Sequence, residues 1–428
     1  MSVNIKPTVI FFLSSLLGVM LFLSGCKEDP TLPVLNTGEA RDITINSAII
    51  AGNVTSDGGA EVTARGMCWG NEAEPSINDN FKVSGTGQGE FNCEITGLDP
   101  NTEYHVRAYA ENSVGIAYGN EVTFTTGIAA PTVTTRQVTG ITNNTAVCGG
   151  TVTYDGGGPI TEKGICWSTT PDPDYGDSRI TAGTVGDTYS CTMTNLLQGT
   201  KYYVRAYVKN SGGIAYGEQI IFNTKLADIE GNLYGTVYIS NQVWMSENLK
   251  TTRLNDNTII PDVPDDSTWV HLSTPAYCWL RNDIQYKDVY GALYNWFTVE
   301  TGKLCPSGWH VPSDEEYKVL EQSLGMAADQ LDLSDWRGTD QGAKMKSTTG
   351  WADGENGTNS SGFSALPGGY RWAKNGAFNG LGMISYWWSS ELNDLYGWYR
   401  RLDGQNSGVF RSGTKKTGGK YIRCIKNN

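Results

Sequence analysis

The sequence predicts a multidomain protein in which two all-β sandwiches precede an α+β domain. The chain has 428 residues, which is too long for one ordinary hydrophobic core. The stretch "EYHVRAYAENSVGIAYG" from Glu103 returns as "KYYVRAYVKNSGGIAYG" from Lys201, 98 positions later, which indicates a duplicated domain. Finally, 11 of the 13 tryptophans follow Leu226, so the last part of the chain is a domain of a different kind.

The N-terminus has the features of an export signal. An apolar run of 15 residues extends from Val9 to Leu23, which is short for a bilayer span but typical of a signal-peptide core. It ends in "LSGC", which resembles the lipobox of bacterial lipoproteins. The resemblance implies a signal peptide over 1–25, lipidation of Cys26 and an anchor linker over 26–31, with an ordinary secretory signal as the alternative. The following "KED" resembles the surface-export tag of Bacteroidota lipoproteins, so we expect a lipid-anchored outer-membrane protein that faces the cell exterior.

The charge of the chain limits its partners. A formal net charge of −13 disfavours nucleic acid, because a phosphate backbone would be repelled. We expect a glycan or a surface protein as partner, and contact with the membrane through the lipid anchor. The end of the chain is basic, and we interpret it as a solvated face, with an anion site as the alternative. This run comprises Arg411, Lys415, Lys416, Lys420, Arg423 and Lys426.

The two repeats, placed at residues 32–127 and 130–225, have the period of β-strands. From Tyr104 to Ala110 apolar and polar residues alternate, as on a strand with one buried face. Glycine, asparagine and aspartate clusters bound such runs and no helical pattern intervenes, which indicates a sandwich of two sheets. The pattern "GLDPNTEYHVRAYAENSVG" resembles the later strands of a fibronectin type III domain. The resemblance implies that Tyr104 and Tyr202 form the corner that ties a loop to the strand.

The C-terminal domain is expected to mix strands with one clear helix. "NLYGTVYISNQVWMSENL" is strand-like, with a turn at Ser240 and Asn241. In "PSDEEYKVLEQSLG" Ser313 can cap a helix while Glu316 reaches back, and Gly325 ends it. Further strands are predicted at "SYWWSS", "GWYRRLD" and "KYIRCIK".

Six motifs of this domain occur in a fixed order: "GNLYGTVYISNQVWMSENLKTTRLNDNTIIP", "YGALYNWFTV", "LCPSGWHVPSDEEYKVLE", "NSSGFSALPGGYR", "YWWSSE" and "IRCIK". Together they resemble the Fibrobacter succinogenes major paralogous domain, from about Asp228 to Lys426. We therefore assign residues 226–428 to such a domain. Its core resembles the C-type-lectin fold, which implies a helix packed on a small twisted sheet under long loops. The resemblance carries over no catalytic residue, because no activity is established for the family.

The cysteines outside the lipidation site can be oxidised outside the cytoplasm. Cys68 and Cys93 recur as Cys166 and Cys191 at the same offset, so we expect one disulfide in each sandwich. Buried thiols are the alternative. Cys148 has an isoleucine as its counterpart in the first copy, which favours a buried apolar site. It could compete for Cys191 if the two strands are neighbours.

The stretch "LCPSGWHVPSDEEY" brings a cysteine, a histidine and three carboxylates together. In the C-type-lectin fold a disulfide ties the start of a helix to the last strand, which implies a bond between Cys305 and Cys424. A Cys305 nucleophile with His310 as its base is disfavoured, because the turn between them gives no reason to aim the ring back. Trp309 and His310 are expected to pack and to form hydrogen bonds. Cys278 is left unassigned.

No motif of a zinc site, a phosphate loop or a hydrolase nucleophile is present, so we expect neither catalytic residues nor a cofactor. Calcium is an option, because hard oxygen ligands gather in two loops. The two sets are Asp262, Asp265 and Asp266, and Asp353, Glu355 and Asn356. A solvated acidic loop is the more ordinary interpretation of each.

The expected ligand-binding surface lies in the last domain, where flat aromatic rings mix with short polar groups. It comprises Trp388, Asn393, Asp394, Tyr396, Trp398, Tyr399, Arg401, Asp403, Asn406 and Arg411. Strand alternation places Trp398 and Tyr399 on opposite faces, so both cannot be exposed. We expect an outer-membrane-anchored, surface-displayed adhesin with a lectin-like head on a two-sandwich stalk, binding glycan or protein. A glycan-active enzyme without a recognisable motif and a purely structural component of a surface assembly are the alternatives.

Overall fold

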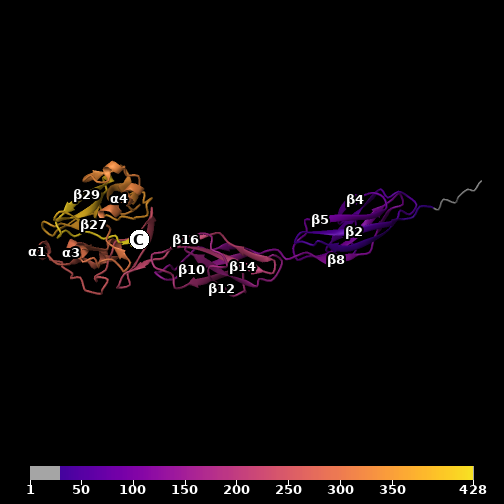
Figure 1. The fold of residues 1–428 in the computed structure, drawn as a ribbon, viewed down its shortest axis with the longest axis horizontal. Helices are drawn as coiled ribbons and strands as arrows, with labels where there is room; N and C mark the ends of the chain where they lie inside the picture. The colour runs from indigo at the N-terminus through magenta and orange to yellow at the C-terminus, as the bar shows by residue number, and fades with distance from the viewer. Residues whose placement is uncertain (1–28, 428) are drawn as a thin grey trace, which may run out of the picture. The chain divides into compact units, whose positions relative to one another are not determined.

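The computed structural model describes residues 29–427, apart from the side chain of Asp353. The predicted signal peptide and the lipidation site Cys26 lie outside the described residues. The chain divides between Ile128 and Ala129 into two compact units. The first unit holds one β-sandwich, and the second holds another β-sandwich followed by the C-terminal domain (Figure 1). Within the described range, no helix is both long and apolar enough to cross a membrane.

The first sandwich is built from antiparallel strands. They are β1 (Val34–Arg41), β2 (Ser47–Ser56), β3 (Ala64–Gly70), β4 (Asn80–Gly85), β5 (Gly89–Thr96), β6 (Glu103–Glu111), β7 (Ile116–Tyr118) and β8 (Val122–Thr125). One sheet has the order β1-β2-β5, and the other has the order β4-β3-β6-β7 with β8 also paired to β6. Alternate side chains of both sheets, among them Ile50, Met67 and Val106, form the core between them.

The second sandwich repeats this arrangement. Its strands are β9 (Thr132–Thr135), β10 (Ala146–Tyr154), β11 (Glu162–Ser168), β12 (Ser178–Ala182), β13 (Thr188–Met193), β14 (Lys201–Asn210), β15 (Gly213–Tyr216) and β16 (Ile220–Asn223). The sheets are β13-β10-β9 and β12-β11-β14-β15, with β16 paired to β14. The Tyr104 hydroxyl accepts a hydrogen bond from the backbone N–H of Asp99, and Tyr202 accepts one from Leu197, both at 3.0 Å. The predicted pair of all-β sandwiches with their tyrosine corners is therefore confirmed.

The predicted sandwich disulfides Cys68–Cys93 and Cys166–Cys191 are wrong, because all four thiols are free and buried. Strand alternation is the physical reason. Cys93 points into the core between the sheets, whereas the Cys68 thiol donates to the backbone oxygen of Pro75, at 3.2 Å, outside that core. In the second sandwich Cys191 lies in the core and the Cys166 thiol bonds to the equivalent proline. The two members of each predicted pair therefore face away from each other.

The C-terminal domain combines short helices with several sheets. Its strands are β17 (Leu226–Ala227), β18 (Leu233–Tyr234), β19 (Thr236–Ile239), β20 (Gln242–Met245), β21 (Tyr277–Trp279), β22 (Ala292–Tyr294), β23 (Trp309–His310), β24 (Asp335–Arg337), β25 (Gly368–Arg371), β26 (Phe378–Leu381), β27 (Ile384–Asn393), β28 (Tyr396–Asp403), β29 (Asn406–Thr414) and β30 (Ile425–Lys426). The α-helices are α1 (Asp266–Val270), α2 (Lys287–Tyr290), α3 (Trp296–Glu300), α4 (Asp314–Ser323) and α5 (Gln341–Met345), and the 3-10 turns are η1 (Leu280–Asn282), η2 (Ile284–Tyr286), η3 (Ala328–Gln330) and η4 (Ala352–Gly354). The largest sheet has the order β24-β29-β28-β27-β25-β26.

The predicted helix is confirmed as α4, which packs against β27 (Figure 1). Ser313 caps it and Glu316 completes a capping box, which satisfies two backbone N–H groups of the first turn. The predicted turn at Ser240 separates β19 from β20. The strand predicted at "KYIRCIK" is confirmed only as the short β30, and the strand β29 was missed because its sequence is rich in glycine and polar residues.

The predicted disulfide between Cys305 and Cys424 is confirmed, with a Cα–Cα distance of 5.9 Å. It joins the segment before α4 to the segment before β30, and so closes most of the domain into one loop. Cys278 is a free buried thiol, and burial raises its pKa to about 12. Cys278 is therefore a core residue rather than a reactive one.

The second sandwich and the C-terminal domain touch within their common unit. The backbone N–H of Lys201 donates to the Tyr238 hydroxyl at 2.9 Å, and Lys426 Nζ donates to the backbone oxygen of Gly199 at 3.2 Å. A Cβ atom at Gly199 would lie 2.5 Å from the Trp309 ring, so only glycine permits this approach. A fragment that begins at Leu226 would lose these contacts.

Candidate functional site

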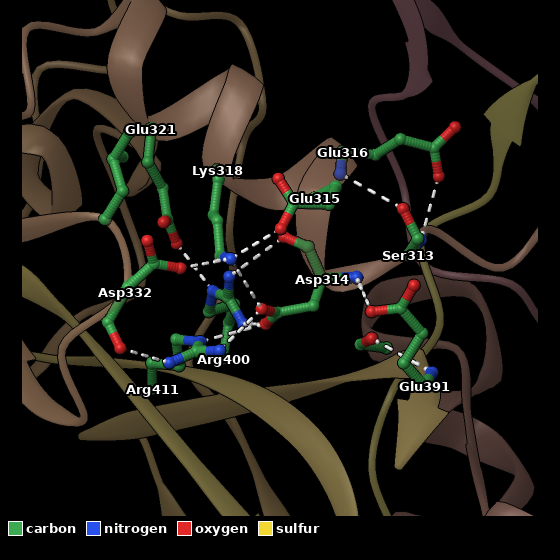
Figure 2. Close-up of polar contacts among 12 residues, drawn as sticks. Ser313, Asp314, Glu315, Glu316, Lys318, Glu321, Asp332, Glu391, Arg400 and Arg411 are labelled. Carbon is green, nitrogen blue, oxygen red and sulfur yellow. Dashed lines mark hydrogen bonds and ion pairs between the residues drawn. The ribbon is translucent and has the colours of Figure 1, made fainter. Parts of the chain in front are cut away.

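One face of the largest sheet carries a buried network of charges beneath α4 (Figure 2). Asp314 accepts from Arg400 Nη1 at 2.7 Å and from Arg411 Nη2 at 2.6 Å. Glu321 accepts from Arg400 Nε at 2.6 Å and from Arg337 Nη2 at 2.9 Å. All five side chains are buried. Each charge has an opposite partner, as a buried ionic group requires.

The electrostatics of this network indicate a structural role. Burial alone would raise the pKa of Asp314, but the hydrogen bonds from Arg411 and the charge of Arg400 outweigh it and hold that pKa well below its ordinary 3.8. Lys318 Nζ adds a further positive charge 3.4 Å from Asp314 and 2.6 Å from Glu315. Because the central charges are paired and buried, this face positions α4 on the strands rather than offering groups to a ligand.

The histidine of the stretch before α4 also has a structural partner. His310 Nε2 lies 2.8 Å from Glu316 Oε1, and its Nδ1 lies 2.7 Å from Asn427 Oδ1. The hydrogen bond to Glu316 raises the pKa of His310 above its ordinary value. Cys305 has no free thiol because of its disulfide. The prediction that His310 serves packing and hydrogen bonding is therefore confirmed.

Trp388 and Arg411 lie in the interior, so the prediction that they bind a ligand is wrong. Trp398 lies at the edge of the interior. Trp388 is fully buried, and its indole N–H donates to the backbone oxygen of Tyr294 at 2.8 Å. Arg411 is 6% exposed and is committed to Asp314. Trp398 is half-buried, with its ring centroid 3.9 Å from the Arg411 guanidinium carbon. These side chains fill the domain core and its edge.

The opposite face of the same sheet carries a line of aromatic side chains, which we call the aromatic row. It comprises Trp336, Phe410, Tyr399, Tyr386 and Tyr370, from β24, β29, β28, β27 and β25 respectively. The ring centroids of successive members are 5.3, 6.1, 5.2 and 4.4 Å apart. Neighbouring strands lie about 4.8 Å apart. One ring from each of these adjacent strands therefore produces a nearly continuous line of rings across the sheet. Trp336 is 36% exposed, Phe410, Tyr399 and Tyr370 are half-buried, and Tyr386 is buried.

Arg401 belongs to the same face as the aromatic row. Its guanidinium carbon lies 5.4 Å from the Trp336 ring and 5.5 Å from the Phe410 ring, within the range of cation–π contacts. Asp403 pairs with Arg401 from the same strand. Tyr399, Arg401 and Asp403 thus come together from the predicted set, because alternate residues of β28 share a face. The other four rings escaped prediction, because their proximity depends on strand pairing that no local pattern records.

Lys420 lies beside the aromatic row. Its Nζ is 4.4 Å from the ring centroids of both Tyr386 and Tyr399 and 4.8 Å from that of Trp388. No carboxylate in the described part of the chain pairs with this ammonium group, and burial lowers the pKa of Lys420 to about 7. The prediction of a solvated basic run is wrong here, since Lys420 and Arg423 are 3% and 1% exposed.

The remaining predicted residues lie at the two ends of β28. Asn393, Asp394 and Tyr396 belong to the hairpin between β27 and β28 and are exposed. Asn406 begins β29, and its Oδ1 accepts from the backbone N–H of Gly408 at 2.8 Å. The predicted binding set therefore separates into a buried or half-buried group, a group on the same sheet face as the aromatic row, and residues in two turns.

Three of the six oxygen ligands considered for calcium have partners within their own loops or nearby, and the side chain of Asp353 lies outside the described part of the structure. Among residues 29–427, no group of three or more histidine, cysteine, aspartate or glutamate side chains could hold a metal ion. Asp265 caps α1 by accepting from the backbone N–H of Thr268 at 2.7 Å, and Asp266 pairs with the buried Arg371 at 2.7 Å. Asn356 accepts from the backbone N–H of Trp351 at 3.1 Å. These groups stabilise loops one by one and do not converge.

The structure thus defines a multidomain protein with two antiparallel β-sandwiches and an α+β domain whose largest sheet presents an aromatic row. Residues 237–426 match the Fibrobacter succinogenes major domain. The resemblance carried by the six sequence motifs is therefore confirmed for the C-terminal domain, which makes up less than half of the chain.

No curated protein matches this chain. Among solved structures, the chain is similar to the crystal structure of chicken CNTN1 FN1-FN3 domains, at 15% identity and a TM-score of 0.28, over 51% of this chain and 77% of that one. It is also similar to the sensor domain of the anti-sigma factor RsgI4 in Pseudobacteroides cellulosolvens, at 22% identity and a TM-score of 0.18, over 22% of this chain and 94% of that one.

Proposed function

We propose that the protein is a surface-displayed binding lipoprotein of the outer membrane, anchored through Cys26, whose C-terminal domain binds a glycan along the aromatic row. The observation that carries this proposal is the alignment of one ring from each of five neighbouring strands on one sheet face. Aromatic faces stack on sugar rings, and adjacent polar groups orient the hydroxyls. The two sandwiches then act as a spacer between membrane and ligand.

The charges of this face favour a neutral sugar chain. Arg401 is neutralised by Asp403, and Lys420 is buried and loses its charge near pH 7. A narrow strip of rings with little net charge offers stacking surface rather than ion pairing. A protein partner generally needs a wider patch with a desolvated centre, so a glycan is the better fit.

A glycan array probed with the full chain in detergent tests this proposal. Trp336 is the variant of choice, because it is 36% exposed and lies at the open end of the row. Trp336→Ala should weaken binding roughly fivefold, since one ring contact is worth about 1 kcal/mol. Trp372→Ala is the matched control, because Trp372 is 45% exposed and is not a member of the row.

Three results would redirect the assignment. An array without binding, obtained with a folded chain, would contradict the glycan proposal and favour a protein partner. Shortened glycans in the recovered ligand, detected by mass spectrometry, would favour an enzyme. Equal losses in Trp336→Ala and Trp372→Ala would move the site away from the row. The anchor is tested separately, since Cys26→Ala should release the exported protein from the membrane fraction.

A further inference from the structure

The second sandwich contains a pair of cysteines that the first sandwich lacks. Cys148 on β10 and Cys191 on β13 are directly opposite each other in the antiparallel ladder. Both side chains lie in the core cluster between the two sheets and are 2% and 8% exposed. The equivalent ladder position in the first sandwich pairs Ile50 with Cys93. The duplicated domains therefore differ at one side chain of an otherwise equivalent cross-strand pair.

The geometry of this pair suits a disulfide. Directly opposite residues of an antiparallel ladder have Cα atoms about 4.5–5.5 Å apart, and disulfides span Cα distances of about 4.4–6.8 Å. Both residues point to the same side of their sheet, into the core. In the structure both thiols are free and the Cys148 thiol donates to the backbone oxygen of Arg136 at 3.2 Å, so bond formation requires the Cys148 side chain to turn toward Cys191. We propose that Cys148 and Cys191 form a second disulfide of this protein when the chain folds under oxidising conditions.

The chemistry requires an oxidant, and a small-molecule disulfide such as oxidised glutathione supplies it. The two cysteine S–H bonds break, one S–S bond forms between Cys148 and Cys191, and the glutathione disulfide is reduced to two glutathione thiols. Burial raises the pKa of the Cys148 thiol to about 11, so little thiolate is present in the folded sandwich at neutral pH. The bond therefore forms during folding, before the sheets close over it.

The other cysteines provide internal comparisons. Cys305–Cys424 is already linked and reports whether the chain has been oxidised. Cys68 and Cys166 face away from the sandwich cores, so they remain free thiols under the same conditions. In the cell, formation of the new bond depends on the export that is part of the proposed function, but the chemistry can be tested without it.

The test is to refold the full chain with a reduced and oxidised glutathione mixture, block free thiols by alkylation and identify peptides by mass spectrometry. A refolded sample is counted as oxidised only when the peptide that joins Cys305 to Cys424 is detected. We expect a peptide that joins Cys148 to Cys191, and its loss in Cys148→Ile, which recreates the pair of the first sandwich. Ile50→Cys should add an equivalent link to Cys93.

Two outcomes overturn the proposal. If Cys305 is linked to Cys424 while Cys148 and Cys191 are both fully alkylated, the pair does not form a bond. A link from Cys191 to any cysteine other than Cys148 would overturn it as well. Cys148→Ile introduces the apolar side chain that Ile50 provides at the equivalent position of the first sandwich. A folding defect is therefore not expected to obscure the result.

Discussion

The two faces of the largest sheet use neighbouring residues for opposite purposes. Arg400 points beneath α4, where it joins Asp314 and Glu321 in a buried network of opposite charges. Arg401, the next residue, points to the other face and lies among aromatic rings with Asp403 as its partner. Strand alternation, not residue type, therefore decides whether an arginine holds this domain together or contributes to its candidate binding face.

The largest expected effect on stability comes from disrupting the charge network beneath α4. We call this side of the sheet its inner face. Arg400→Met should lower the free energy of unfolding by about 3–5 kcal/mol, because Asp314 and Glu321 would be left as buried carboxylates short of a partner. Arg401→Met should cost less than about 1 kcal/mol, since its ion pair is partly exposed. Urea denaturation, followed through the tryptophans of the C-terminal domain, measures both. Equal losses would contradict the contrast between the faces.

Lys420 differs from the arginines of both faces, because it is a buried cation surrounded by rings instead of carboxylates. Its folded pKa of about 7 lies below the ordinary 10.5, so between these pH values the unfolded chain binds more protons than the folded chain. Stability should therefore rise as the pH increases from 7 to 10, by at most about 1.4 kcal/mol per pH unit. Cation–π contacts reduce this slope.

Lys420→Met is the corresponding variant, and it should flatten this slope and stabilise the domain near pH 7. Lys415→Met is the control, because Lys415 is exposed. Denaturation midpoints between pH 6 and 10, measured in the same buffers, separate the two variants. A slope that persists in Lys420→Met would assign it to another group.

Acid should weaken the inner face through Asp314. The pKa of Asp314 is lowered in the folded chain, so its contribution is fully present above the ordinary value of 3.8 and is lost as the pH falls through the lower folded value. We expect a loss of about 1–3 kcal/mol over this acid range, in line with hydrogen bonds to charged groups. Asp314→Asn should reduce the acid dependence, whereas Glu315→Gln, at an exposed carboxylate, should leave it unchanged.

The smallest effect on stability is expected on the outer face of the sheet, which carries the aromatic row. Trp336→Ala should change the free energy of unfolding by less than about 1 kcal/mol, because the ring is partly exposed and belongs to an edge strand of the row. The same substitution is expected to reduce glycan binding roughly fivefold. Thermal unfolding and array binding, measured on one preparation, test this separation. A large loss of stability would make Trp336 a core residue instead.

Local patterns were sufficient for several features of the fold. The 98-residue repeat and the period of two predicted the sandwiches, and "PSDEEYKVLEQSLG" predicted α4 with its cap at Ser313. These signals are readable because each depends on residues close together in the chain. The equivalence of the repeats was less informative for Cys68 and Cys93, since repetition does not reveal which face of a strand a side chain occupies.

Local sequence patterns predicted the domain order, the alternating strands and the separation of Trp398 from Tyr399 onto opposite faces. Which of these faces lies under α4 depends on tertiary packing. Packing of α4 on one side places Arg411 in the interior and leaves Phe410 on the outer face. The aromatic row exists only because β24, β29, β28, β27 and β25 are neighbours in the sheet. Strand pairing is a long-range interaction between segments distant in sequence, so no local pattern contains it.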